Sequence, residues 1–270
     1  MHRRIQLTCA WAGPLLVVLV GLGLTVFADL IPANSPGDSS GQVVQHYADH
    51  TTGIRIGMVL VIFGGGLIVP WAIALATQVR RAAPGHPILF HIQVACSIGA
   101  CMLLVIFSLV GGLAAFRPGE IDEQTTQALN DLLWFCWVIP GSYFEVWSVV
   151  VGVSILLDKR AQPIFPRWSG YLSILAAMSY LPGCLGYFFK DGPFAYNGLF
   201  VWWIPTVVFF AWIMPMSFLT IGAINQEARE NPDGAPTIAD PAVVAEFARL
   251  RSELARRGLT QPDPVGTNVP

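Results

Sequence analysis

The chain has 270 residues, of which 54% are hydrophobic and only 12% are charged, against about 25% charged residues in ordinary soluble domains. This composition excludes an ordinary water-soluble domain and indicates an integral membrane protein. The net charge of −2 gives no electrostatic basis for a nucleic-acid partner, so we expect the lipid bilayer as partner and no nucleic acid.

Six largely apolar stretches follow one another along the chain, each of about the length that a helix needs to cross a bilayer. They cover residues 9–30, 53–77, 88–115, 132–157, 168–189 and 199–224. Strand-like alternation is missing, and a chain in lipid must bond its own backbone polar groups, so we predict helices. The predicted fold class is all-α: a polytopic transmembrane helix bundle with six spans, forming one domain over residues 1–225.

The first span has features of a signal peptide, because Val26-Phe27-Ala28 resembles a cleavage site. Its apolar run is longer than the usual signal core of roughly 7 to 15 residues, so we favour an uncleaved helix. Proline residues interrupt five of the six spans and permit kinks there. These are Pro14, Pro70, Pro140, Pro182, Pro205 and Pro215.

The distribution of basic residues predicts the orientation. One side of the membrane holds Arg3, Arg4, Arg80, Arg81, Lys159, Arg160 and Arg167, whereas the opposite loops hold only Arg55, Arg117 and Lys190. The positive-inside rule therefore places both termini in the cytoplasm. Basic residues are almost all arginine, and Ala, Gly and Pro are abundant, which favours a bacterial source. We thus predict a multi-pass protein of the bacterial inner membrane.

Tryptophans support this register, because their amphipathic rings favour membrane–water interfaces. Those near predicted span ends are Trp11, Trp71, Trp134, Trp137, Trp168, Trp202 and Trp203. The remaining two, Trp147 and Trp212, lie deeper, and we expect them to pack inside the bundle.

After Ile224 the composition becomes polar, which predicts a cytoplasmic tail over residues 226–270. Asp240-Pro241 is a good helix start and Gly258 a good stop, so we predict one short helix at about 241–257. A narrow apolar stripe on this helix is a possible docking surface for a protein partner, although the charges around it favour a solvated helix. We expect the bundle to fold without the tail.

Glu145 is the only acidic residue deep inside a predicted span, where a carboxylate costs at least roughly 2.5 kcal/mol. Tyr180 and Ser179 lie at a similar depth, about 18 Å from the inner surface at 1.5 Å per residue, and Ser142 precedes Glu145 by one helical turn. We expect Glu145 to face the bundle interior near Tyr180. A structural hydrogen bond is favoured there over a proton-carrying or acid–base role.

His46 and His50 are four residues apart in the first external loop, with Asp49 beside them. On a helix the two imidazoles share a face, so these three residues are weak candidates for metal ligands. The zincin motif needs a glutamate directly after the first histidine, and Tyr47 stands there. We therefore expect no metal. We also expect no cofactor, because paired haem ligands are missing, as are a GxSxG elbow and paired intramembrane acids.

Three segments resemble a loosely defined group of uncharacterised bacterial polytopic membrane proteins. They are YADHTTGIRIG at 47–57, FPRWSGY at 165–171 and FFKDGPF at 188–194. The resemblance covers about residues 5–225. It implies a membrane bundle and carries over no catalytic residue.

The sequence favours an integral membrane protein without enzymatic activity, and three alternatives stay open. A proton or small-solute transporter using Glu145 predicts a polar cavity at mid-depth. A membrane enzyme acting on a lipophilic substrate predicts a pocket open to lipid that holds Glu145 with Tyr180. An accessory subunit predicts exposed apolar helix faces and a docking tail helix.

Overall fold

A computed structural model describes residues 2–231, 249 and 253, and these residues form helices and no strand. The chain divides into two compact units, Met1–Glu230 and Asn231–Pro270. Arg249 and Glu253 are helical. The rest of the predicted tail helix at about 241–257 lies outside the described residues, so its proposed docking role stays a prediction.

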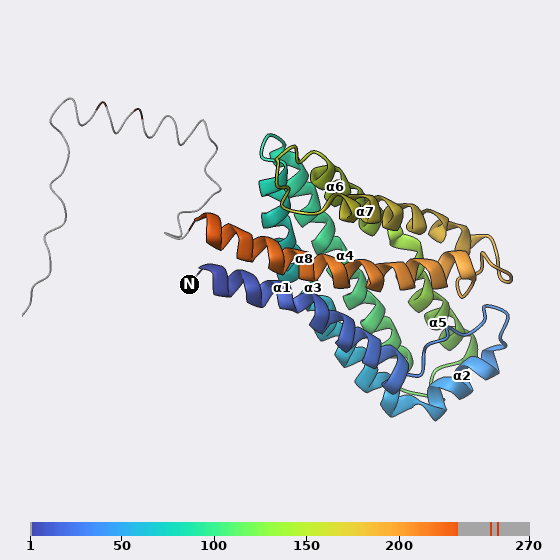
Figure 1. Ribbon diagram of the computed structural model, residues 1–270. Coiled ribbons are helices and arrows are strands. Elements are labelled where there is room, and N and C mark those ends of the chain that lie inside the picture. Colours follow the sequence, from blue (N-terminus) through green and yellow to red (C-terminus); the bar gives the residue numbers. More distant parts are fainter. Residues whose placement is uncertain (1, 232–248, 250–252, 254–270) are drawn as a thin grey trace, which may run out of the picture. The chain divides into compact units, whose positions relative to one another are not determined.

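Helices make up nearly all of the first unit (Figure 1). In chain order they are α1 (His2–Leu22), the π-helix η1 (Gly23–Phe27), α2 (Ser40–Asp49), α3 (Thr51–Ala82), α4 (Pro87–Ala114), α5 (Glu123–Val138), the 3₁₀ helix η2 (Ile139–Gly141), α6 (Ser142–Leu156), α7 (Arg167–Tyr180), the 3₁₀ helix η3 (Leu181–Tyr187), the π-helix η4 (Leu199–Trp203) and α8 (Ile204–Glu230).

Five helical segments in the described part of the chain are long and apolar enough to cross a membrane: Arg3–Phe27, Thr51–Ala82, Pro87–Ala114, Glu123–Leu156 and Leu199–Glu230. They correspond to five of the six predicted spans. The remaining one, predicted at 168–189, consists of α7 and η3. Its Ser, Gly and Tyr residues make this segment less apolar than the other five.

The long helices pack side by side along one direction (Figure 1). α3 packs against both α1 and α4, α6 against α4 and α7, and α8 against α1 and α7. The start of α1 and the end of α8 lie at the same end of the unit, where Arg3 Nη2 donates to Asn225 Oδ1 at 2.7 Å. We call this the terminal end, and the end that carries α2 the opposite end.

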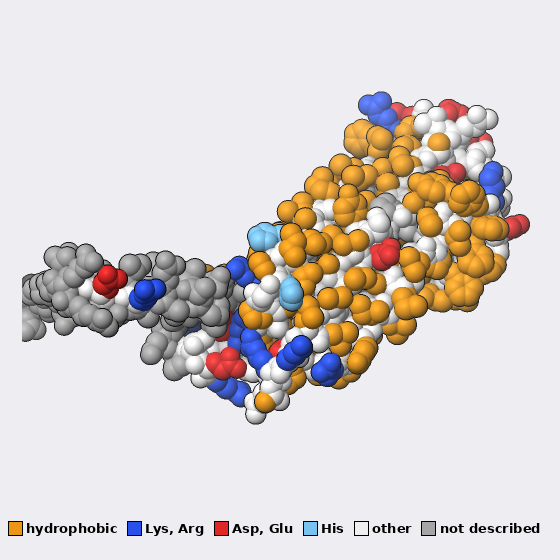
Figure 2. Space-filling view, turned by 90° about the horizontal axis from the view of Figure 1, so that it is seen from above, with side chains coloured by type: hydrophobic (Ala, Val, Ile, Leu, Met, Phe, Trp, Pro, Cys, Tyr) orange, Lys and Arg blue, Asp and Glu red, His pale blue; other side chains and the backbone are white. Residues whose placement is uncertain are grey.

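The surface of the first unit is broadly apolar, and charged side chains gather mainly towards its two ends (Figure 2). Large hydrophobic side chains are exposed along several helices, among them Phe63 on α3 and Leu109 on α4. Because water would disfavour such a surface, it is the surface expected of helices that face lipid.

Three tryptophans predicted at membrane interfaces, Trp71, Trp134 and Trp202, are fully buried. Trp71 forms a triangle with Trp147 and Trp212, whose ring centroids are 5.6–5.8 Å apart. The expectation for Trp147 and Trp212 is thereby confirmed. Burial between helices does not test the depth of the other three in a membrane, so their interface position stays a prediction. The exposed tryptophans are Trp11, Trp168 and Trp203.

Candidate functional site

Three helix interruptions lie towards the opposite end of the bundle, and each contains or adjoins a proline. Pro140 lies in η2, Pro182 lies in η3, and Pro205 is the second residue of α8, which follows η4. Proline has no N–H to donate and crowds the preceding turn, which explains why regular α-helix stops at these points. The sequence predicted kinks at these prolines.

The interruption η3 packs against both η2 and η4, and glycines lie at these contacts. A Cβ placed on Gly141 would lie 3.2 Å from the Cβ of Tyr180, and one on Gly186 would lie 3.3 Å from Val201 Cγ1. A Cβ on Gly183 would collide with the Val138 carbonyl oxygen. The absence of side chains at these positions therefore lets the backbones of η2, η3 and η4 approach closely.

A partly open cavity of about 40 Å³ lies where these segments meet α4 and α8. Twelve residues line it, and none of them carries a charge. Most are aliphatic or aromatic, and the polar atoms come from Cys136, Trp137, Tyr180 and Thr206. An apolar cavity with a few placed polar groups is the usual form of a small-molecule site.

Two polar side chains of the lining differ in their hydrogen bonding. Trp137 Nε1 donates to Thr206 Oγ1 at 3.0 Å, which satisfies the indole. The Tyr180 side chain is only 7% exposed, and its hydroxyl has no hydrogen-bond partner. Ser148 Oγ lies close to this hydroxyl, but it too has no partner at normal hydrogen-bond geometry. A buried hydroxyl without a partner is unfavourable, and this one lies beside Ser148, which does not line the cavity.

The residues proposed from the sequence lie around this cavity in different ways. Glu145 is half-buried on α6, does not line the cavity, and makes no hydrogen bond or ion pair with the described residues. Ser142 is exposed, and Ser179 Oγ donates to the Ala176 carbonyl at 2.7 Å. Tyr180 instead packs against Phe144, with ring centroids 5.9 Å apart.

His46 lies on α2 at the opposite end, and His50 is the residue that caps the end of this helix. The rings of His46 and His50 are 4.7 Å apart, and His50 Nε2 lies 3.3 Å from Asp29 Oδ2. Asp49 accepts a hydrogen bond from Gln45 at 2.7 Å. Within the described residues no group of three His, Cys, Asp or Glu side chains is arranged to hold a metal ion. Burial, followed by repulsion from His50, lowers the pKa of His46 below its ordinary value.

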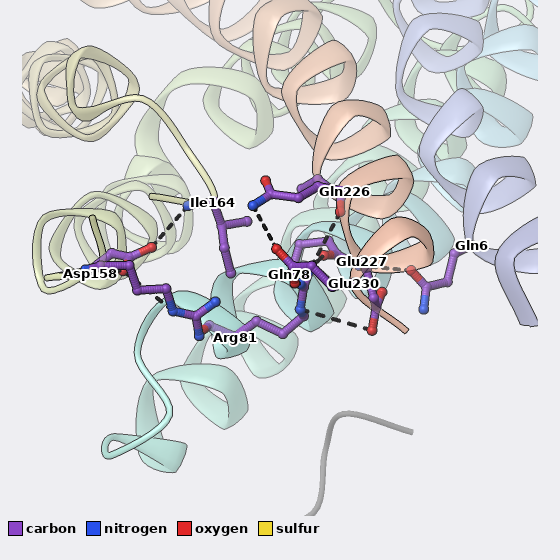
Figure 3. A network of polar contacts seen from close by, with 10 residues as sticks. Gln6, Gln78, Arg81, Asp158, Ile164, Gln226, Glu227 and Glu230 are labelled. Atoms are coloured by element: carbon purple, nitrogen blue, oxygen red, sulfur yellow. Dashed lines mark hydrogen bonds and ion pairs between the residues drawn. The ribbon is translucent and has the colours of Figure 1, made fainter. Parts of the chain in front are cut away.

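A second polar cluster, which the sequence analysis missed, lies at the terminal end (Figure 3). Its centre is Arg81, which is 5% exposed although it was counted as a cytoplasmic surface charge. Arg81 Nη2 donates to Glu230 Oε2 at 2.6 Å, and Nη1 donates to Gln78 Oε1 at 2.6 Å. Gln78 Nε2 in turn donates to Gln6 Oε1 and Glu227 Oε2, both at 2.8 Å.

This cluster joins segments that are far apart in the sequence. Gln78 and Arg81 come from α3, Gln6 from α1, and Glu227 and Glu230 from α8. The α6–α7 connection joins as well, because Arg160 donates to the Arg81 carbonyl. One sequence signal was available: Gln78 and Arg81 lie one turn apart, and so do Glu227 and Glu230, on helices that end at the same side.

The fold and these sites define a helical membrane protein with an apolar cavity beside interrupted helices. The model of a family described as "Domain of unknown function (DUF4386)" matches residues 12–221, and the chain belongs to this family. The predicted resemblance to proteins of uncharacterised function is therefore confirmed. Searches of curated proteins and of solved structures found no match.

Proposed function

We propose that this chain is a six-crossing protein of the bacterial inner membrane with both termini in the cytoplasm. Its sixth crossing is formed by α7 and η3. An even number of crossings is supported by the contact between Arg3 at the start of α1 and Asn225 near the end of α8. The basic residues of the terminal end support the cytoplasmic assignment.

Cysteine labelling tests this topology. Glu120 and Gln162 are both exposed, and they lie in the α4–α5 and α6–α7 connections. In whole cells Glu120→Cys should react with an impermeant sulfonated maleimide, whereas Gln162→Cys should react only after the cells are opened. The reverse pattern would overturn the orientation, and labelling of both variants in whole cells would overturn the even number of crossings.

Within this topology the protein binds a small lipophilic molecule and performs no chemistry on it. The observation that supports this proposal is the apolar cavity beside η2 and η4, which is lined without any charged residue. Catalysis needs an activated nucleophile or an acid–base pair, and within the described residues no Asp, Glu, His or Lys lines the cavity to act as a base beside Cys136 or Tyr180. This arrangement supports binding over the enzymatic alternative.

Two substitutions on one helix test ligand binding. Leu103 lines the cavity and is half-buried, whereas Leu109 on the same helix is 60% exposed. The probe is the apolar molecule 2-methyl-1-octene, added to protein in lipid nanodiscs. It should raise the melting temperature of the wild-type protein and of Leu109→Phe, because binding to the folded state alone stabilises it. It should not stabilise Leu103→Phe, whose ring occupies the cavity.

A uniform response contradicts the proposal. If 2-methyl-1-octene shifts all three proteins equally, it acts through the lipid and not through the cavity. If it shifts none of them, the cavity does not bind such molecules.

Proton-coupled transport is the second candidate function, and Glu145 favours it. The carboxyl group is half-buried, has no partner within the described residues, and follows the interruption η2 by four residues. Interrupted helices are common at transport sites. Glu145→Gln keeps the shape and hydrogen-bonding capacity of the side chain but cannot exchange a proton.

Transport by Glu145 predicts proton flux into wild-type proteoliposomes, followed with an internal pH dye, and none with Glu145→Gln of equal melting temperature. Equal flux in both would assign Glu145 a structural role or none. Absence of flux in the wild-type protein would remove this candidate and leave ligand binding untouched.

A further inference from the structure

We propose that the segment from Tyr187 to Trp203, at the opposite end of the bundle, is an interfacial anchor whose exposed aromatic side chains lie in the head-group region of the bilayer. We call residues 187–203 the aromatic segment. Its exposed side chains are not part of the cavity lining. The inference therefore concerns a second surface of the protein, and it holds for either orientation of the chain in the membrane.

The aromatic segment presents large apolar side chains at its surface. Phe188 is 77% exposed, the largest exposed fraction of any large hydrophobic side chain in the described part of the chain. Five more are between 39% and 62% exposed: Tyr187, Phe189, Leu199, Phe200 and Trp203. Phe189 and Phe200 both pack against Phe194, with ring centroids 5.7 and 5.2 Å from it. These side chains therefore form a connected patch and are not scattered singly over the surface.

A second segment at the same end of the bundle gives a comparison (Figure 1). Residues 28–55 include α2 and the loop before it. No large hydrophobic side chain is exposed in this stretch, whereas six are exposed within residues 187–203. Two segments that both faced water would both be expected to hide most of their large apolar side chains. The contrast indicates that the aromatic segment meets a less polar environment than α2 does.

The aromatic segment is folded and attached to the bundle. Tyr196 is only 2% exposed, and its hydroxyl donates to Asp131 Oδ1 on α5 at 3.3 Å. Turns bond part of the backbone, because Gly198 N donates to the Ala195 carbonyl at 2.8 Å and Phe200 N to the Pro193 carbonyl at 3.0 Å. An irregular backbone is not tolerated among lipid tails, but the interface contains water for the remaining groups. Aromatic rings favour this depth.

The patch continues onto a surface that is expected to face lipid. Leu199, Trp203 and Val207 follow at intervals of four residues from η4 into α8, and all three are exposed. This continuity favours lipid over a protein partner. The charged residues of the aromatic segment are Lys190 and Asp191, whose charges cancel. Transfer of the rings out of water therefore provides the attachment, with no need for anionic lipid.

Bimane fluorescence tests where the aromatic segment lies. Phe188 and Ala48 are both exposed at the opposite end, and Ala48 lies on α2 as the matched control. Phe188→Cys and Ala48→Cys are made in the full chain with Cys184→Ser, because Cys184 is an exposed native thiol. Each is labelled with monobromobimane in phosphatidylcholine nanodiscs. Quenching is measured with a phosphatidylcholine that carries a head-group nitroxide and with iodide in water, after subtraction of the Cys184→Ser signal.

The nitroxide lipid should quench the Phe188→Cys label at least about twofold more than the Ala48→Cys label, and iodide should quench it at least about twofold less. Replacement of part of the phosphatidylcholine by anionic phosphatidylglycerol should leave both ratios unchanged, because the segment has no net charge. Melting temperatures equal to that of Cys184→Ser verify folding. Tyr187→Cys, at a position that is 62% exposed, is the second test site if Phe188→Cys does not fold.

Three results would overturn the inference. Iodide quenching of the Phe188→Cys label as strong as that of the Ala48→Cys label, without additional nitroxide quenching, would place the segment in water. Protection of the Phe188→Cys label from both quenchers would show that a second copy of the chain covers the patch. Nitroxide quenching that requires phosphatidylglycerol would show attachment by charge. None of these results depends on whether the cavity binds 2-methyl-1-octene.

Discussion

Buried polar side chains differ in their hydrogen bonding between the terminal end of the bundle and the cavity. At the terminal end, Arg81 is held by Gln78 and Glu230, and it joins α3 to α8 through hydrogen bonds of normal length. Arg81 Nε makes no hydrogen bond with the described residues, but Glu227 Oε1 lies 4.0 Å from it. At the cavity, Tyr180 is buried just as deeply but its hydroxyl has no partner. A network in which most groups are paired holds its elements in one arrangement, whereas an unpaired group favours whatever supplies its missing partner.

Proline shows the same contrast. Pro14, Pro70 and Pro215 lie inside the α-helices α1, α3 and α8. The other three prolines lie in or next to the interruptions η2, η3 and η4. The lesson is that proline permits a break without requiring one, and that the packing of neighbouring segments decides which breaks form.

The largest effect is expected from shortening α8. A chain that ends after Asn225 loses both carboxylates of the Arg81 network, and Arg81 is left buried without a counter-charge. We expect a loss of about 3–5 kcal/mol of stability, measured by equilibrium unfolding in detergent. A chain that ends after Glu230 keeps the network and should match the full chain. The same comparison tests the expectation that the bundle folds without residues 226–270. Equal stability of the two truncations would show that the network contributes nothing.

Gly183 tests the close approach of the interruptions. In Gly183→Ala the new Cβ meets the Val138 carbonyl oxygen, and we expect a loss of about 1–3 kcal/mol from overpacking. Gly112 on α4 has no atom within 4 Å of the position of an added Cβ. Gly112→Ala should therefore change stability by less than about 1 kcal/mol. Similar results for the two variants would mean that η3 does not need its contact with α5.

Tyr180 and Thr206 should respond with opposite signs. Tyr180→Phe removes an unpaired hydroxyl and should leave stability unchanged or raise it by up to about 1 kcal/mol. Thr206→Val removes the acceptor of Trp137 Nε1 and should cost about 1–3 kcal/mol. Both are measured by thermal unfolding without added probe. A cost for Tyr180→Phe equal to that for Thr206→Val would reveal a partner for the Tyr180 hydroxyl inside the protein.

The smallest effect concerns pH at the opposite end. Burial lowers the pKa of His46 in the folded chain below the ordinary value of 6.5, so the unfolded chain binds the proton more readily. The contribution of His46 is complete above pH 6.5 and is lost as the pH falls through that value. The melting temperature should drop less in His46→Gln than in the wild-type protein between about pH 7.5 and about pH 5.5. An identical drop in the two proteins would show that the burial of His46 does not contribute to the pH dependence of stability.

The sequence alone determined how the chain runs through the bundle. Apolar runs of membrane-spanning length predicted six spans, and five of them are helical segments of that length. The spacing of His46 and His50 agreed with the helix α2, and three prolines lie in or next to the interruptions η2, η3 and η4. These features depend on hydrophobic length and backbone chemistry within one short stretch, which is information that the stretch itself carries.

Tertiary structure decided which of these features meet. Sequence depth suggested Glu145 as a partner for Tyr180, whereas Tyr180 packs against Gly141 and Phe144. Arg81 was counted with the surface charges, yet partners about 150 residues further along the chain surround it. Depth along a helix follows from counting residues, but the direction in which a side chain points, and what faces it, depends on how distant helices pack together.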